Sequence, residues 1–138
     1  MMKLKKILYV VFSVVLIVLL SFNIFAAVKP HDEINWTNIQ SITCAVGFDD
    51  NGGEAIVSVL GKVGTESILV NLTIYKQRTD GTWTYVTQTV QSRSSRYFPC
   101  IYDFPATPGC TYKASATVTV ITDGVSETAN VYCESTFD

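Results

Sequence analysis

The sequence predicts an all-β domain, a seven-stranded antiparallel β-sandwich, behind an N-terminal hydrophobic leader. Apolar residues alternate with polar ones at period two in seven short segments, which is typical of half-buried strands. Turn-forming pairs such as Asp80-Gly81 and Asp123-Gly124 separate these segments, and no window after the leader keeps a helical period. Short strands at regular spacing with such turns favour two facing sheets.

The expected strands cover residues 42–48, 54–62, 68–76, 82–90, 96–104, 110–121 and 125–134. Asn71 and Thr73 fall on the polar side of the third segment, opposite an apolar side. The second segment is apolar on both sides, so its orientation stays open. The fourth is rich in threonine, which favours a strand over a helix.

Residues 1–27 have the layout of a secretory signal peptide. Three lysines precede an apolar run over residues 7–20 that only Ser13 interrupts, and small residues follow it. An uncleaved membrane anchor is the alternative, since residues 7–25 approach the length that spans a bilayer. Either outcome places the rest of the chain outside the cell, secreted or at the cell surface, with membrane contact only through this segment. Residues 28–38 read as a flexible lead-in, and residues 39–138 as the sandwich domain.

The length and net charge of the chain limit the classes of function that are plausible. The chain has 138 residues, enough for one domain after the leader. Without the three leader lysines, seven basic residues stand against 12 acidic ones, a net charge of −5. An acidic domain repels phosphate backbones, which argues against nucleic-acid binding.

Four cysteines follow the leader: Cys44, Cys100, Cys110 and Cys133. An even number in an oxidising compartment predicts two disulfides, and the missing CxxC spacing argues against a metal site. The first and last strands of such a sandwich lie on the same side, so we expect Cys44 to pair with Cys133, leaving Cys100 with Cys110. A Cys110–Cys133 bridge is the less favourable alternative. The last turn would set Ala114 opposite Cys133, about 13 Å along the strand from Cys110.

The corner before the sixth segment reads Phe104-Pro-Ala-Thr-Pro-Gly109-Cys-Thr-Tyr112. It resembles the turn and tyrosine corner of fibronectin type III and related immunoglobulin-like sandwiches, in which the tyrosine hydroxyl bonds to backbone. The resemblance implies an architectural role for Tyr112. With Asp80-Gly-Thr-Trp83-Thr-Tyr-Val86 and Ser126-Glu127-Thr128, it makes residues from about 40 to 138 similar to a group of small exported proteins of Gram-positive bacteria, a domain of unknown function. It implies a fold and a location but no activity.

Three aromatic residues are candidates for stacking against sugar rings: Trp36, Trp83 and Tyr85. Trp83 and Tyr85 share one side of the fourth segment and Val86 and Val90 share the other, so one pair must be the buried one. We expect Trp83 to pack in the core or at an edge, with Tyr85 following it. Trp36, in the lead-in, is expected to be the more exposed tryptophan.

No catalytic arrangement can be assembled from this sequence. His31 is the single histidine and lies in the lead-in, so neither a Ser-His-Asp nor a Cys-His set is available. The acidic stretch at 49–54 is better explained as a hydrated hairpin turn than as a calcium loop. We therefore expect no enzyme activity, no metal and no cofactor.

These observations predict a secreted, monomeric, non-catalytic binding or interaction module. It would act on an extracellular protein or glycan through loops or an exposed strand edge. Carbohydrate binding through exposed aromatics is the first alternative function. A small secreted hydrolase or an enzyme inhibitor is the second.

Overall fold

The computed structural model describes residues 36–138, which form seven antiparallel strands and no helix. The strands are β1 (Ile39–Asp49), β2 (Gly52–Gly61), β3 (Thr65–Gln77), β4 (Trp83–Arg93), β5 (Tyr97–Phe104), β6 (Thr111–Thr122) and β7 (Val125–Thr136). None of the described residues forms a helix long and apolar enough to cross a membrane. The expected signal peptide or anchor and residues 28–35 of the lead-in lie outside the described residues.

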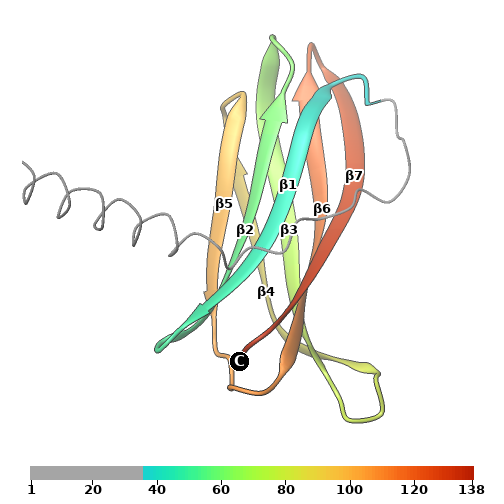
Figure 1. Cartoon of the computed structure of the whole chain (residues 1–138). Coiled ribbons are helices and arrows are strands. Elements are labelled where there is room, and N and C mark those ends of the chain that lie inside the picture. Colours follow the sequence, from blue (N-terminus) through green and yellow to red (C-terminus); the bar gives the residue numbers. More distant parts are fainter. Residues whose placement is uncertain (1–35) are drawn as a thin grey trace, which may run out of the picture.

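The strands form two sheets that face one another (Figure 1). One has three strands in the order β1-β2-β5, and the other has four in the order β4-β3-β6-β7. Side chains alternate across each strand, so one side of each sheet is apolar and the two apolar sides enclose a common core. The predicted all-β fold, with seven antiparallel strands, is thus confirmed, and the sixth and seventh strands differ from the expected limits by two residues or fewer.

The core is built mainly from small and β-branched residues on the two central strands of the four-stranded sheet. Its fully buried members there are Ile68, Val70, Leu72, Ile74, Ala114, Ala116, Val118 and Val120. From the other sheet Ala55, Val57 and Val59 pack against them. This settles the orientation of the second strand: the alanine and valine side faces the core, and Ile56 and Leu60 point outward.

Side-chain contacts close both long sides of the sandwich. On one side the disulfide Cys44–Cys133 joins β1 to β7, with a Cα–Cα distance of 5.9 Å. On the other side the Tyr102 hydroxyl of β5 lies 2.6 Å from the Thr87 hydroxyl and donates to the Gln88 carbonyl of β4. The expected Cys44–Cys133 pair is therefore confirmed, and on each long side a side-chain contact links the edge strands of the two sheets.

Glu127 of β7 fixes the point where the chain enters the domain. Its carboxylate accepts hydrogen bonds from the backbone N–H groups of Thr37, Asn38 and Ile39 at 2.7–3.0 Å. Partial desolvation favours the neutral acid, but these donors and nearby Lys62 outweigh it and lower the pKa of Glu127. Hydrogen bonds therefore tie residues 37–38, the last two of the expected lead-in, to β7.

The opposite end of the sandwich is filled by four aromatic rings: Phe48, Phe104, Tyr112 and Phe137. Phe48 stacks on Phe137 with ring centroids 4.8 Å apart, and Tyr112 lies 5.4 Å from Phe104. The Tyr112 hydroxyl accepts a hydrogen bond of 2.8 Å from the Thr107 N–H, five residues upstream. Tyr112 thus ties the β5–β6 connection to the core, which is the architectural contact expected of it.

The expected Cys100–Cys110 disulfide is wrong, because both cysteines are free. Cys100 lies in the row of the three-stranded sheet that contains Cys44. Cys44 is bonded to Cys133, and Cys133 pairs with Ala114, so this row lies at the level of Ala114 in the other sheet. Cys110 is four residues before Ala114, about 13 Å at strand rise, whereas a disulfide needs Cα atoms within about 7 Å. The corner between β5 and β6 brings the rings of Phe104 and Tyr112 together, not Cys100 and Cys110.

A β-bulge in β4 changes which of its side chains face the core. Thr87 pairs with Ile74 and Tyr85 with Tyr75, so Val86 is an extra residue in the β4 strand. Val86 packs against the core, but Val90, four residues further along, is 56% exposed. The bulge therefore puts Val90 on the same outer side as Tyr85, and the choice between an aromatic and a valine side does not arise.

Candidate functional site

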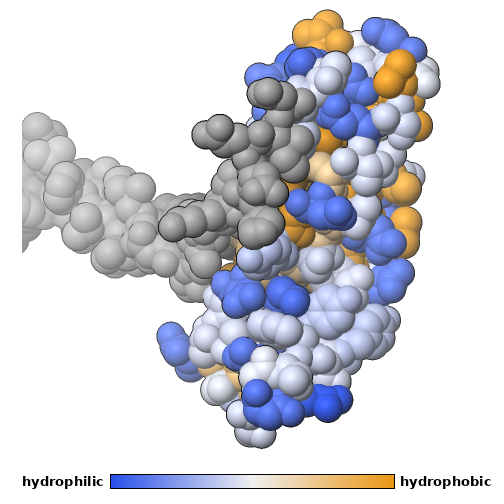
Figure 2. All heavy atoms as spheres, turned by 90° about the vertical axis from the view of Figure 1, so that its right-hand side faces the viewer, coloured by the Kyte–Doolittle hydropathy of each residue, from blue (hydrophilic) through white to orange (hydrophobic). Residues whose placement is uncertain are grey.

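Large hydrophobic side chains that remain exposed gather in three places on the described domain. Leu69, Tyr85, Val90 and Tyr132 lie on the outer side of the four-stranded sheet, and Tyr97 and Ile101 on that of the three-stranded sheet. Val63, in the β2–β3 turn, and Val125, the first residue of β7, lie at the end where the chain enters. Figure 2 shows the β7 side, with hydrophobic residues scattered over its upper half and a largely hydrophilic lower half.

The largest of these groups lies on what we call the four-strand face: the outward side chains of β4, β3, β6 and β7. Strand register arranges it in rows: Tyr85–Tyr75–Lys113–Glu134, Gln88–Thr73–Ser115–Tyr132, Val90–Asn71–Thr117–Asn130 and Ser92–Leu69–Thr119–Thr128. Trp83 continues the face beyond Tyr85 and pairs with Gln77. Aromatic side chains thus gather at one end, and the rest of the face carries mostly hydroxyl and amide groups, together with the exposed Leu69, Val90 and Tyr132.

Lys113 organises the aromatic end of this face. Its Nζ atom lies 4.5 Å from the centroid of the Trp83 ring and 5.2 Å from that of Tyr75. A cation over two aromatic faces is attracted by both ring quadrupoles, and at a partly exposed site each contact stabilises by about 0.5–1 kcal/mol. Lys113 therefore holds both rings against the sheet. Tyr85, beside them, remains 60% exposed.

The remainder of the four-strand face is almost uncharged, and most of its side chains are polar. In its four rows only Lys113 and Glu134 carry charge. The Thr117 hydroxyl donates to Asn130 at 2.8 Å, and the Thr119 and Thr128 hydroxyls lie 3.1 Å apart. These cross-strand bonds fix side-chain rotamers, so the face presents ordered hydroxyl and amide groups.

Two of the three predicted aromatic residues meet on this face, and the third does not. Trp83 packs at the edge strand β4, under Lys113, and is not part of the core. Tyr85 does not follow it into packing. Trp36, expected to be the more exposed tryptophan, instead packs against the core with its indole N–H buried and without a partner. Asn38, two residues later, donates to the Val125 carbonyl at the far end from Trp83.

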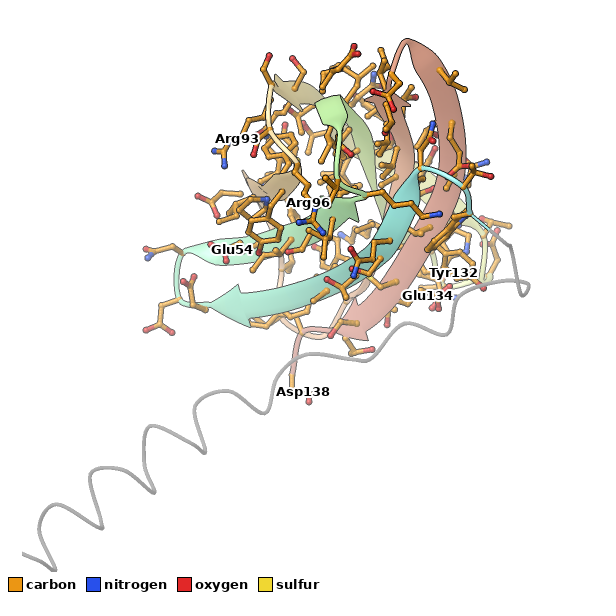
Figure 3. The ribbon with its side chains drawn as sticks, turned by 90° about the horizontal axis from the view of Figure 1, so that it is seen from above. Glu54, Arg93, Arg96, Tyr132, Glu134 and Asp138 are labelled. Carbon is orange, nitrogen blue, oxygen red and sulfur yellow. A yellow bond between two sulfur atoms is a disulfide. The ribbon has the colours of Figure 1, made fainter. Side chains whose placement is uncertain are left out.

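Three residues of this face were not predicted from the sequence: Tyr75, Lys113 and Tyr132. Strand parity was the signal that could have found them. Tyr75 shares the outward parity of Asn71 and Thr73, and Tyr132 alternates with the buried Val131 and Cys133. Figure 3 shows Tyr132 and Glu134 on the side of the domain opposite to Glu54, Arg93 and Arg96.

The remaining reactive groups of the described residues do not form a site. Burial raises the pKa of the Cys100 thiol, which keeps it protonated and unreactive. Within residues 36–138 no group of three or more histidine, cysteine or acidic side chains is arranged to hold a metal ion. The chain matches no known family model, no curated protein and no solved structure.

Proposed function

We propose that this chain is an exported, non-catalytic binding module of the immunoglobulin-like or fibronectin type III-like class. Its ligand site is the aromatic end of the four-strand face. The disulfide and the lysine-led hydrophobic leader support export, because disulfides persist in oxidising compartments. Two sheets of three and four strands and the Tyr112 contact support the fold class.

The observation that carries the site is the exposure of Tyr85 and Tyr132 on a face with ordered neighbours. Tyr85 is 60% and Tyr132 46% exposed, and both lie on sheet strands, not on mobile loops. Tyrosine and tryptophan on a rigid surface lose little side-chain entropy on binding, so they dominate binding energy where they are found. A site on a sheet face replaces the loop or strand edge expected from the sequence.

The test compares binding of two matched variants to intact extracellular surface preparations. Tyr85→Ala with Tyr132→Ala should weaken binding by roughly tenfold or more, since hot-spot truncations cost about 2 kcal/mol or more. Tyr97→Ala with Ile101→Ala truncates two exposed apolar side chains on the other sheet and should leave binding unchanged. Equal losses in both variants would contradict the site.

A neutral glycan is the second candidate for the ligand, and the polar rows favour it. Sugars present hydroxyl groups and apolar ring faces together, and the four-strand face offers ordered hydroxyl and amide groups beside Trp83, Tyr75 and Tyr85. With two opposite charges in four rows, the face has no excess charge for an anionic polymer.

Tryptophan fluorescence can test the glycan directly. In a Trp36→Phe background Trp83 is the single tryptophan of the chain. Titration with neutral gluco-, xylo- and chito-oligosaccharides should shift its emission, because a stacked sugar must displace Lys113 from the ring or cover its exposed edge. The shift should vanish in Tyr85→Ala. An unchanged spectrum with all three would reject the glycan but not a protein ligand.

A further inference from the structure

The outer side of the three-stranded sheet has an arrangement of its own, which we call the three-strand face. Strand register places its side chains in four rows: Gly47–Glu54–Asp103, Ala45–Ile56–Ile101, Thr43–Ser58–Pro99 and Ser41–Leu60–Tyr97. Ile101 and Tyr97 are each 50% exposed, and Ile56 and Leu60 are partly exposed beside them. These four large apolar side chains lie on one sheet face and form a patch, whereas single exposed apolar residues are normal on any protein surface.

The two ends of this face carry opposite charges, and neither end is neutralised by its own neighbours. Desolvation and the nearby carboxylates of Asp103 and Asp49 raise the pKa of Glu54. The charged groups around Glu54 are therefore other acids, and this end of the face is acidic. At the other end the Arg96 guanidinium donates to the Gly61 carbonyl at 2.9 Å and to the Gln40 side-chain oxygen at 3.0 Å. Both acceptors are neutral, and they hold the guanidinium at the end of the sheet. Figure 3 shows Glu54 and Arg96 on the same side of the domain.

We propose that the three-strand face binds a second copy of this chain. A twofold axis that lies in the interface and runs across the strands reverses the strand direction of the partner. It then sets the acidic row of each copy, Glu54 and Asp103, against Arg96 of the other, with Ile56, Leu60 and Ile101 between them. An axis along the strands would place acid against acid, so the charges select the first arrangement.

The size of the face sets the strength of this dimer. Three strands about 4.8 Å apart and seven residues at about 3.3 Å each give a footprint of roughly 300 Å² per copy. Stable interfaces bury about 800 Å² of accessible surface on each partner, so the dimer should be weak and should form at high local concentration, as on a cell surface. Crosslinking is therefore a better assay than chromatography.

The test places one cysteine at the centre of the face. Ser58→Cys, in a Cys110→Ser background that removes the accessible native thiol, is expressed as the full chain with its leader and treated with a short bis-maleimide. We expect a covalent dimer on reducing gels. The matched control is Thr117→Cys at the centre of the four-strand face, which should stay monomeric. Equal yields at the two positions, or no dimer at Ser58→Cys, would overturn the proposal.

Charge exchange distinguishes a specific dimer from an apolar collision. Glu54→Arg or Arg96→Glu alone should lower the crosslinked yield roughly tenfold, because each change acts at two symmetry-related contacts. The two changes together, or coexpression of the two single variants, should restore it. Glu54→Arg leaves the Arg96 contacts with Gly61 and Gln40 in place, so an unchanged yield in this variant would contradict the arrangement whatever Arg96→Glu does to folding. The Tyr85 variants should dimerise normally, so this result is independent of the ligand site.

Discussion

Removal of the disulfide gives the largest stability change that the structure predicts. Cys44 and Cys133 are 89 residues apart in sequence, so their bond closes a long loop in the unfolded chain. On the chain-entropy model a loop of this length corresponds to about 4.5 kcal/mol at 25 °C. That is a large part of the 5–15 kcal/mol that typically separates a folded domain from its unfolded state. We therefore expect Cys44→Ala with Cys133→Ala to lose about this amount and to be partly unfolded at 37 °C.

Equilibrium unfolding in urea measures the difference in the free energy of unfolding. Cys100→Ala is the matched control, because it truncates a fully buried free thiol without breaking a crosslink. We expect this control to lose about 1 kcal/mol of unfolding free energy. Twice that loss estimates how much of the double variant's loss comes from packing and not from the crosslink. If the double variant loses no more than this packing part, the loop-closure reasoning is refuted.

Four further substitutions have a predicted direction of stability change. Glu127→Gln should lower the free energy of unfolding by about 1–2 kcal/mol at neutral pH, because a carboxylate that accepts three backbone N–H groups is replaced by a neutral amide. Since the folded-state pKa of Glu127 is lowered, that advantage is complete above its usual value and is lost as the pH falls through the lower one, where the urea midpoints of the two proteins should converge. Glu54→Gln should act in the opposite direction: its folded-state pKa is raised, so ionisation weakens the native state as the pH rises above about 4.5, and the variant should have the higher midpoint at pH 7 but an equal one at pH 3. Tyr112→Phe leaves the Thr107 N–H without its acceptor and should cost about 1–2 kcal/mol in the same assay, whereas Tyr102→Phe tests the side chain that seals the other edge and should cost about 1 kcal/mol.

Alternation along the chain was sufficient to predict the strands, because each one buries a single side against a single core. Val57, Val118 and Val131 each lie on the buried side of their strand, with Ser58, Thr117 and Tyr132 beside them on the outer side. The Cys44–Cys133 pair followed from the same regularity, since it depends only on which strands are first and last.

The errors came from features that interrupt this regularity or lie outside it. One extra residue in β4 moved Val90 to the surface, and period two does not reveal where a bulge will occur. The free state of Cys100 and Cys110 depends on how far along their strands they lie from the corner, which spacing in sequence does not give. Trp36 packs because Glu127, some ninety residues later, holds the adjacent backbone.

The contact made by Glu127 also determines how the domain is presented. Chain that precedes Trp36 joins the sandwich beside the β6–β7 turn, whereas Trp83 lies by the β3–β4 hairpin, about 35–40 Å away along the strands. If the leader remains in a membrane, this geometry directs Tyr85 and its neighbours outward, toward whatever approaches the cell. The aromatic end of the four-strand face would then be the part of the domain farthest from the lipid headgroups.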